Sequence, residues 1–174
     1  MKNLKLFLII AAFSPLAFVG CKKGDTGPAG PKGPAGPDSI MYSAWITLNT
    51  QYNTTDSLYE QAITASALTS DILNKGAVLS YLAIPPQTGT DTVFFSLSEA
   101  NTLLSPISQA LYVGEIDIYA VSDYSGLLYR YVLIPGTILT NGYNGKVYTK
   151  QELSTMTYSQ VKQTFGSLAK STAN

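Results

Sequence analysis

The sequence predicts an all-β fold: an antiparallel β-sandwich of about seven strands with one or two short C-terminal helices, preceded by a signal peptide and an extended Gly-X-Y stalk. Three observations lead to this prediction. Short segments of alternating apolar and polar residues recur through residues 39–174, turn residues separate these segments, and their combined length suits one domain. A partly open barrel is the alternative architecture.

Seven segments carry the strand pattern. In the first, the even-numbered residues from Ile40 to Leu48 are apolar and should share one face, which leaves Trp45 on the other face. Segment 77–84 is almost entirely apolar, which predicts a central strand that is covered on both faces. The seven expected strands are 40–48, 59–65, 77–84, 92–97, 109–113, 115–121 and 127–134.

The connections follow from turn and cap chemistry. Residues 49–57 are polar and should form a loop or a hairpin connection, and residues 101–107 should be irregular. Thr69 can cap a short helix that ends at Gly76, where a positive φ would suit glycine. The capping-box spacing Thr-x-x-Glu/Gln occurs twice near the C-terminus and predicts two short helices there; it begins at Thr149 and at Thr157.

Residues 1–20 have the features of a secretory signal. Lys2 and Lys5 form a positively charged start that precedes an apolar stretch of about 13 residues. This stretch is too short to span a bilayer comfortably. Gly20 and Cys21 then resemble a bacterial lipoprotein box, with cleavage after Gly20 and lipidation of Cys21. We therefore expect a lipid anchor at the outer membrane, with the choice between a periplasm-facing and a surface-exposed domain left open.

Residues 21–38 follow as a linker built on a three-residue period. Gly recurs five times in strict register, at Gly24, Gly27, Gly30, Gly33 and Gly36. This is the period of polyproline II, and in collagen the glycines lie where three chains meet. Because the triplets are few and no Y position is proline, a single-chain spacer of about 46 Å is favoured over a triple helix. We expect a monomer, with a collagen-like homotrimeric surface protein as the alternative.

Two further stretches complete a family resemblance. Residues 68–82 read LTSDILNKGAVLSYL, and residues 128–136 read LYRYVLIPG. Together with the lipoprotein box and the Gly-X-Y repeat, they resemble the uncharacterised collagen-like lipoproteins of Bacteroidota, over nearly the whole chain. The resemblance implies an extracytoplasmic lipoprotein, and it carries over no catalytic residue.

The composition excludes several classes of active site. The chain has no histidine and only one cysteine, so it lacks the residues for a Ser-His-Asp triad, a Cys-His pair or the usual zinc sites. The formal net charge is zero, and no basic run predicts binding to nucleic acid. We expect no catalytic residues, no cofactor, no metal and no enzymatic activity.

Charged residues on the later strands offer weaker candidates. Glu115 and Asp117 are two residues apart on an expected strand and share a face, where they could act as a carboxylate pair or bind Ca²⁺ with Asp123. A solvated outer face explains them better, so a carboxylate-based hydrolase is the least favoured hypothesis. Arg130, the only arginine, is expected to pair with Glu115 or Asp117 across neighbouring strands, and a binding role is the less favoured alternative.

Trp45 is the best single candidate for a ligand-binding residue. The chain has one tryptophan and twelve tyrosines, and aromatic rings can stack on the faces of sugars. Ser39, Ser57 and Thr92 each follow Asp and precede an aliphatic residue, which resembles the O-glycosylation sites of secreted Bacteroidota proteins. The sequence thus predicts a non-enzymatic, lipid-anchored module of the cell envelope, with a glycan- or protein-binding module as the sharper alternative.

The anchor gives the first testable prediction. Replacing the lipidated thiol by Cys21→Ser should abolish incorporation of a labelled fatty acid and release the chain from the membrane fraction, because the acyl chains supply the membrane affinity. Metabolic labelling followed by fractionation measures both effects. A Cys21→Ser chain that stays in the membrane fraction would contradict the lipid anchor.

Overall fold

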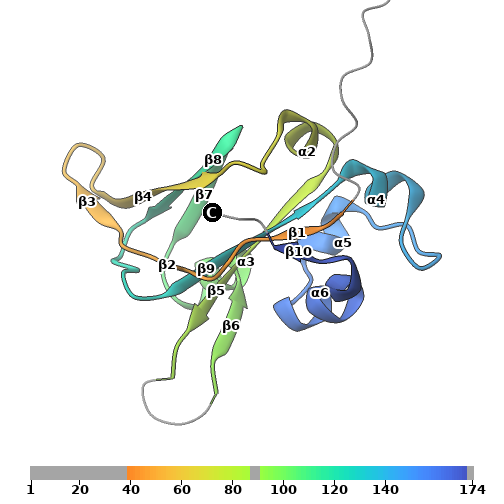
Figure 1. The fold of residues 1–174 in the computed structure, drawn as a ribbon. Helices are drawn as coiled ribbons and strands as arrows, with labels where there is room; N and C mark the ends of the chain where they lie inside the picture. Colours follow the sequence, from red (N-terminus) through yellow and green to blue (C-terminus); the bar gives the residue numbers. More distant parts are fainter. Residues whose placement is uncertain (1–38, 87–90, 172–174) are drawn as a thin grey trace, which may run out of the picture. The chain divides into compact units, whose positions relative to one another are not determined.

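The computed structural model describes residues 39–86 and 91–171. The expected signal peptide, Cys21 and the five glycines of the Gly-X-Y stalk lie outside the described residues. The described chain is mostly β, with strands in two sheets and five short α-helices (Figure 1). Within it, no helix combines the length and the apolar character needed to cross a membrane.

A six-stranded sheet forms the middle of the domain. Its strands follow the order β10 (Lys170–Ser171), β1 (Met41–Tyr42), β9 (Leu128–Ile134), β5 (Ala77–Ile84) and β6 (Val93–Ser96), and β2 (Ile46–Thr47) also pairs with β9. The sheet is mixed, because β1 and β10 run parallel while all its other pairs are antiparallel. The expectation of a wholly antiparallel fold is therefore wrong at this edge.

A four-stranded antiparallel sheet packs against the first. Its order is β3 (Gln51–Asn53), β4 (Leu58–Ala65), β8 (Gly114–Ala120) and β7 (Ile107–Tyr112). The hairpin between β3 and β4 is one of the two connections expected for residues 49–57, and Gly114 lies in the turn between β7 and β8 with a φ of 83°. The described residues thus form ten strands rather than about seven, because the expected strand 40–48 is divided into β1 and β2 and the short edge strands β3 and β10 are added.

The helices are also more numerous than expected. Those at α2 (Ser70–Lys75), α5 (Lys150–Ser154) and α6 (Tyr158–Phe165) were predicted from their caps, and both C-terminal capping boxes are confirmed. The prediction missed α3 (Leu97–Leu103) and α4 (Gly136–Asn141). Ser96 and Glu99 form a capping box that starts α3, so strand β6 ends at Ser96 and the first three residues of the segment expected to be irregular are helical.

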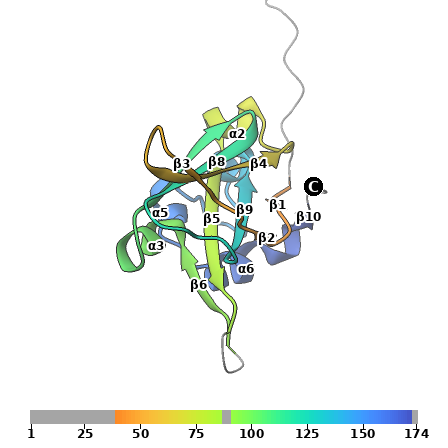
Figure 2. The same ribbon diagram turned by 90° about the vertical axis from the view of Figure 1, so that its left-hand side faces the viewer.

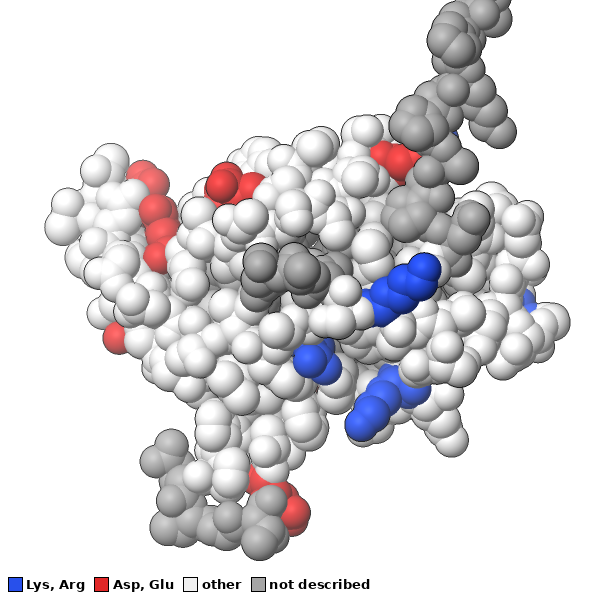
Figure 3. All heavy atoms as spheres, viewed as in Figure 1, with Lys and Arg blue, Asp and Glu red and all other residues white. Residues whose placement is uncertain are grey.

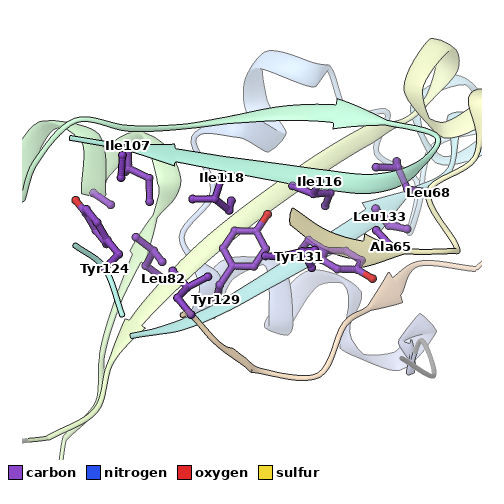
Figure 4. Close-up of a cluster of buried hydrophobic side chains, with 14 of the residues drawn as sticks. Ala65, Leu68, Leu82, Ile107, Ile116, Ile118, Tyr124, Tyr129, Tyr131 and Leu133 are labelled. Atoms are coloured by element: carbon purple, nitrogen blue, oxygen red, sulfur yellow. The ribbon is translucent and has the colours of Figure 1, made fainter. Parts of the chain in front are cut away.

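Apolar side chains cover both faces of the six-stranded sheet. One buried cluster lies between the sheets and includes Ile116, Ile118, Tyr129, Tyr131 and Leu133 (Figure 4). A second cluster lies between the opposite face and the C-terminal helices α4 to α6 (Figures 1 and 2); it includes Tyr81, Val132, Ile134, Leu153, Val161 and Phe165. This burial on both faces confirms the prediction made for segment 77–84, which forms β5.

The first strand contains an extra residue. Tyr42 lies opposite Val132, whereas Ile46 lies opposite Tyr129, so three residues on this strand face two on β9. Such an insertion is a β-bulge. At the bulge, the backbone N–H of Ser43 donates to the carbonyl of Tyr131 over 3.0 Å, and the N–H of Tyr131 donates to Ser43 Oγ over 3.1 Å.

The bulge overturns the predicted single face of segment 40–48. One inserted residue reverses which side chains point to which face. Ile40 and Tyr42 therefore belong to the cluster under the helices, whereas Leu48 belongs to the cluster between the sheets. For the same reason, Trp45 lies on the side of the sheet that the helices cover, where it packs against the second cluster.

Gly76 serves a different purpose from the one its position predicts. It ends α2, but its φ is −91°, so no left-handed conformation is involved. A Cβ at this position would lie 2.3 Å from the carbonyl oxygen of Ile134 and 3.0 Å from that of Ile72. Glycine is required because two backbone segments meet here without room for a side chain.

This close approach gives the second prediction. Gly76→Ala should lower the free energy of unfolding by about 2–3 kcal/mol, because α2 and β9 must move apart to admit the methyl group. Urea denaturation measures the change. Gly166→Ala is the matched control: its Cβ would come no closer than 4.0 Å to Lys162, and its φ is −58°, so stability should stay equal or rise slightly. Equal stability of the two variants would contradict this account of the packing.

Candidate functional site

Three aromatic rings from distant parts of the chain meet at one edge of the helix-covered face. We call Trp45, Phe94 and Tyr158 the aromatic corner. The ring centroid of Trp45 lies 5.6 Å from that of Phe94 and 5.3 Å from that of Tyr158, and the Phe94 and Tyr158 rings stack at 5.1 Å. Phe94 is 41% exposed, and Trp45 and Tyr158 are half-buried, so the corner is anchored in the domain but open to solvent.

The guanidinium group of Arg130 lies against this corner. Its central carbon is 4.7 Å from the centroid of the Trp45 ring and 5.8 Å from that of Tyr158, within the range of cation–π attraction. Its Nη1 donates a hydrogen bond to the hydroxyl of Tyr158, and its Nε is buried without a partner among the described residues. The aromatic contacts therefore fix the guanidinium while leaving some of its donors unused.

The expected pairing of Arg130 with Glu115 or Asp117 is wrong. Arg130 is on β9 opposite Tyr81, whereas the two acids are on β8 in the other sheet. Side chains alternate along a strand, and Tyr129 and Tyr131 point into the cluster between the sheets, so Arg130 points to the opposite face. Across the described residues, the ion pairs are Lys75 with Asp71 and Lys146 with Glu152, and neither involves Arg130.

A pocket of about 260 Å³ adjoins the aromatic corner. Arg130 and Tyr158 form part of its wall, and the remaining lining residues are Tyr42, Ser43, Lys162, Gly166, Ala169, Lys170 and Ser171. Of the lining residues that the structure describes, three are cationic and none is acidic. Figure 3 shows Lys and Arg side chains gathered over the region of α6 and β10, with the visible Asp and Glu side chains toward the edges of this face. We call this the cationic pocket.

Tyr42 ties the cationic pocket to the helix layer. Its hydroxyl donates to the carbonyl oxygen of Val161 over 3.3 Å. Burial, helped by the nearby Tyr158 and opposed by Arg130, raises the pKa of Tyr42 to about 12. The Tyr42 hydroxyl therefore stays protonated at neutral pH and remains a hydrogen-bond donor.

The other predicted residues lie elsewhere. Ser39 precedes β1, Thr92 precedes β6, and Ser57 is exposed in the turn between β3 and β4 with a φ of 58°. These positions leave the O-glycosylation hypothesis as a prediction. None of the three lines the cationic pocket.

Two of the three carboxylates considered for calcium make local hydrogen bonds. Asp117 accepts from the hydroxyl of Tyr119 over 3.3 Å, and Asp123 accepts from the hydroxyl of Thr50 over 2.7 Å. Hydrogen bonds from Ser125, and then from Thr50, lower the pKa of Asp123. Across residues 39–86 and 91–171, no three His, Cys, Asp or Glu side chains come together as a metal site would require.

Sequence reasoning identified Trp45 but none of its partners. One local signal was available: Tyr158 and Lys162 are four residues apart on α6, so they share a face of that helix. The contributions of Phe94 and Arg130 depend on sheet order, which one sequence does not reveal. No family model matches the chain, and neither a curated protein nor a solved structure matches it.

The corner and the pocket together offer ring faces, positive charge and hydrogen-bond donors. Such groups can contact a ligand by stacking, by charge and by hydrogen bonding.

Proposed function

We propose that this chain is a non-enzymatic, lipid-anchored β-sandwich module of the cell envelope, carried on a short polyproline-II-like stalk, that binds a glycan at the aromatic corner. The anchor and the stalk rest on Cys21 and the Gly-X-Y repeat. The resemblance to collagen-like lipoproteins of Bacteroidota supports the same location at the outer membrane.

One observation carries the binding part of the proposal. Trp45 is half-buried against Phe94 and Tyr158, so its ring is held in place, and the neighbouring Phe94 is exposed. Rigid rings beside a pocket with polar groups favour recognition of a ligand that has both apolar faces and hydroxyls. Sugars have this combination.

The third prediction tests this site with a glycan array. The chain from residue 21 onward, made soluble by Cys21→Ser, should bind a subset of glycans, and Trp45→Ala should weaken that binding about tenfold or more, because a stacking surface is lost. Tyr52→Ala is the matched control, since Tyr52 is 54% exposed on β3 in the other sheet.

A second variant guards against a folding defect in Trp45→Ala. Phe94→Ala removes an exposed ring on β6. It should weaken binding of the same glycans with little change in thermal stability. The proposal would be contradicted if the chain bound none of the glycans, or if the Trp45→Ala and Tyr52→Ala chains bound them equally well.

A further inference from the structure

The cationic pocket concentrates positive charge. Arg130, Lys162 and Lys170 line it, and among the described residues no Asp or Glu lines it and neither ion pair includes any of these three. Like charges at close range repel one another, and an arrangement of this kind lowers the energy of an anion that enters. The charge pattern therefore specifies the sign of the ligand.

Arg130 is prepared for such a ligand. The ring of Trp45 and the hydroxyl of Tyr158 hold its guanidinium at the pocket wall, so little side-chain freedom remains to be lost on binding. The planar guanidinium matches the two oxygens of a carboxylate and the oxygens of a sulfate or phosphate.

The lysines complete the site from two other elements. Lys162 comes from α6, one helical turn after Tyr158, and Lys170 comes from β10 at the edge of the six-stranded sheet. Both side chains belong to exposed residues, so each can reach a group in the pocket while its ammonium stays partly hydrated. The two lysines and Arg130 surround the pocket without depending on one another for their position.

The size and position of the cationic pocket indicate what kind of anionic ligand it can hold. Its volume of about 260 Å³ is slightly below the range of pockets that enclose a whole drug-sized ligand. It suits one charged group with the ring that bears it. Since Arg130 and Tyr158 belong both to this pocket and to the contacts of Trp45, a chain of sugars could place one acidic unit in the pocket and the next against the aromatic corner.

We propose that the cationic pocket binds the anionic group of an acidic glycan, a uronic acid carboxylate or a sulfate ester, while the aromatic corner holds the adjoining sugar. This inference rests on the proposed function for its second half. The new claim is that the ligand carries a negative charge. This claim can be wrong even if a neutral glycan binds at the aromatic corner.

The fourth prediction uses a ligand pair in which methyl esterification neutralises each carboxylate and adds one methyl group to it. Isothermal titration of the Cys21→Ser chain from residue 21 onward should show tetragalacturonate binding at least about tenfold more tightly than its fully methyl-esterified form. A sulfated oligosaccharide and its desulfated form make the second pair and show which anion is preferred. Raising the salt from about 50 to 300 mM should weaken only the charged ligands, because salt screens these contacts.

Lysine variants assign the effect to the pocket. Lys162→Gln and Lys170→Gln should each weaken binding of the preferred acidic ligand about three- to tenfold and leave the affinity for its neutral form unchanged. Both residues are exposed and neither supports the core, so the variants should fold normally. Lys75→Gln on α2 is the matched control, outside the pocket, and should change neither.

Two outcomes would overturn the inference. One is equal affinity for the acidic and neutral members of both pairs. The other is a preference for the acidic members that is as strong in the Lys162→Gln and Lys170→Gln variants as in the Lys75→Gln control. If equal affinities are accompanied by loss of binding in Trp45→Ala, the acidic ligand is excluded and the glycan site at the aromatic corner is retained.

Discussion

Two hydrogen bonds between Ser43 and Tyr131 hold one extra residue in the first strand, and both layers of the domain depend on that residue. In a regular strand, Leu48 would lie on the same face as Tyr42, under the helices. The bulge instead sends Leu48 into the core between the sheets, where it is buried; a side chain of this size contributes about 1.5–3 kcal/mol when fully buried. It also turns Trp45 toward Arg130 rather than into the core between the sheets.

The C-terminal helices cover one face of the six-stranded sheet and contribute residues to the aromatic corner and the cationic pocket. Because the six-stranded sheet is apolar on both faces, it requires a second layer, and Val161 and Phe165 of α6 are completely buried there. The same helix presents Tyr158 to the aromatic corner and Lys162 to the cationic pocket. A helix with one face in the core holds the residues of its neighbouring face in fixed positions. The aromatic corner and the cationic pocket are therefore formed by the packing that folds the domain.

The sequence predicted what local rules decide. Hydrophobic alternation located the long strands, and the cap at Thr69 and the boxes at Thr149 and Thr157 located three helices. It missed α3 although Ser96-x-x-Glu99 carries the same box, because the apolar run before it continued the strand pattern. Sheet order, the bulge and the parallel edge strand arise from contacts distant in the sequence, so the partners of Trp45 could not be predicted, and Arg130 was assigned to the wrong sheet.

The central claim is that Trp45 and Arg130 form one ligand site, and the single tryptophan makes this directly measurable. Indole emission reports the surroundings of Trp45 alone. Titration with the preferred acidic oligosaccharide should change the emission saturably, with the same dissociation constant as calorimetry, and the neutral form should change it far less at equal concentration. Saturable heat of binding with unchanged Trp45 emission would place the ligand elsewhere and contradict the account.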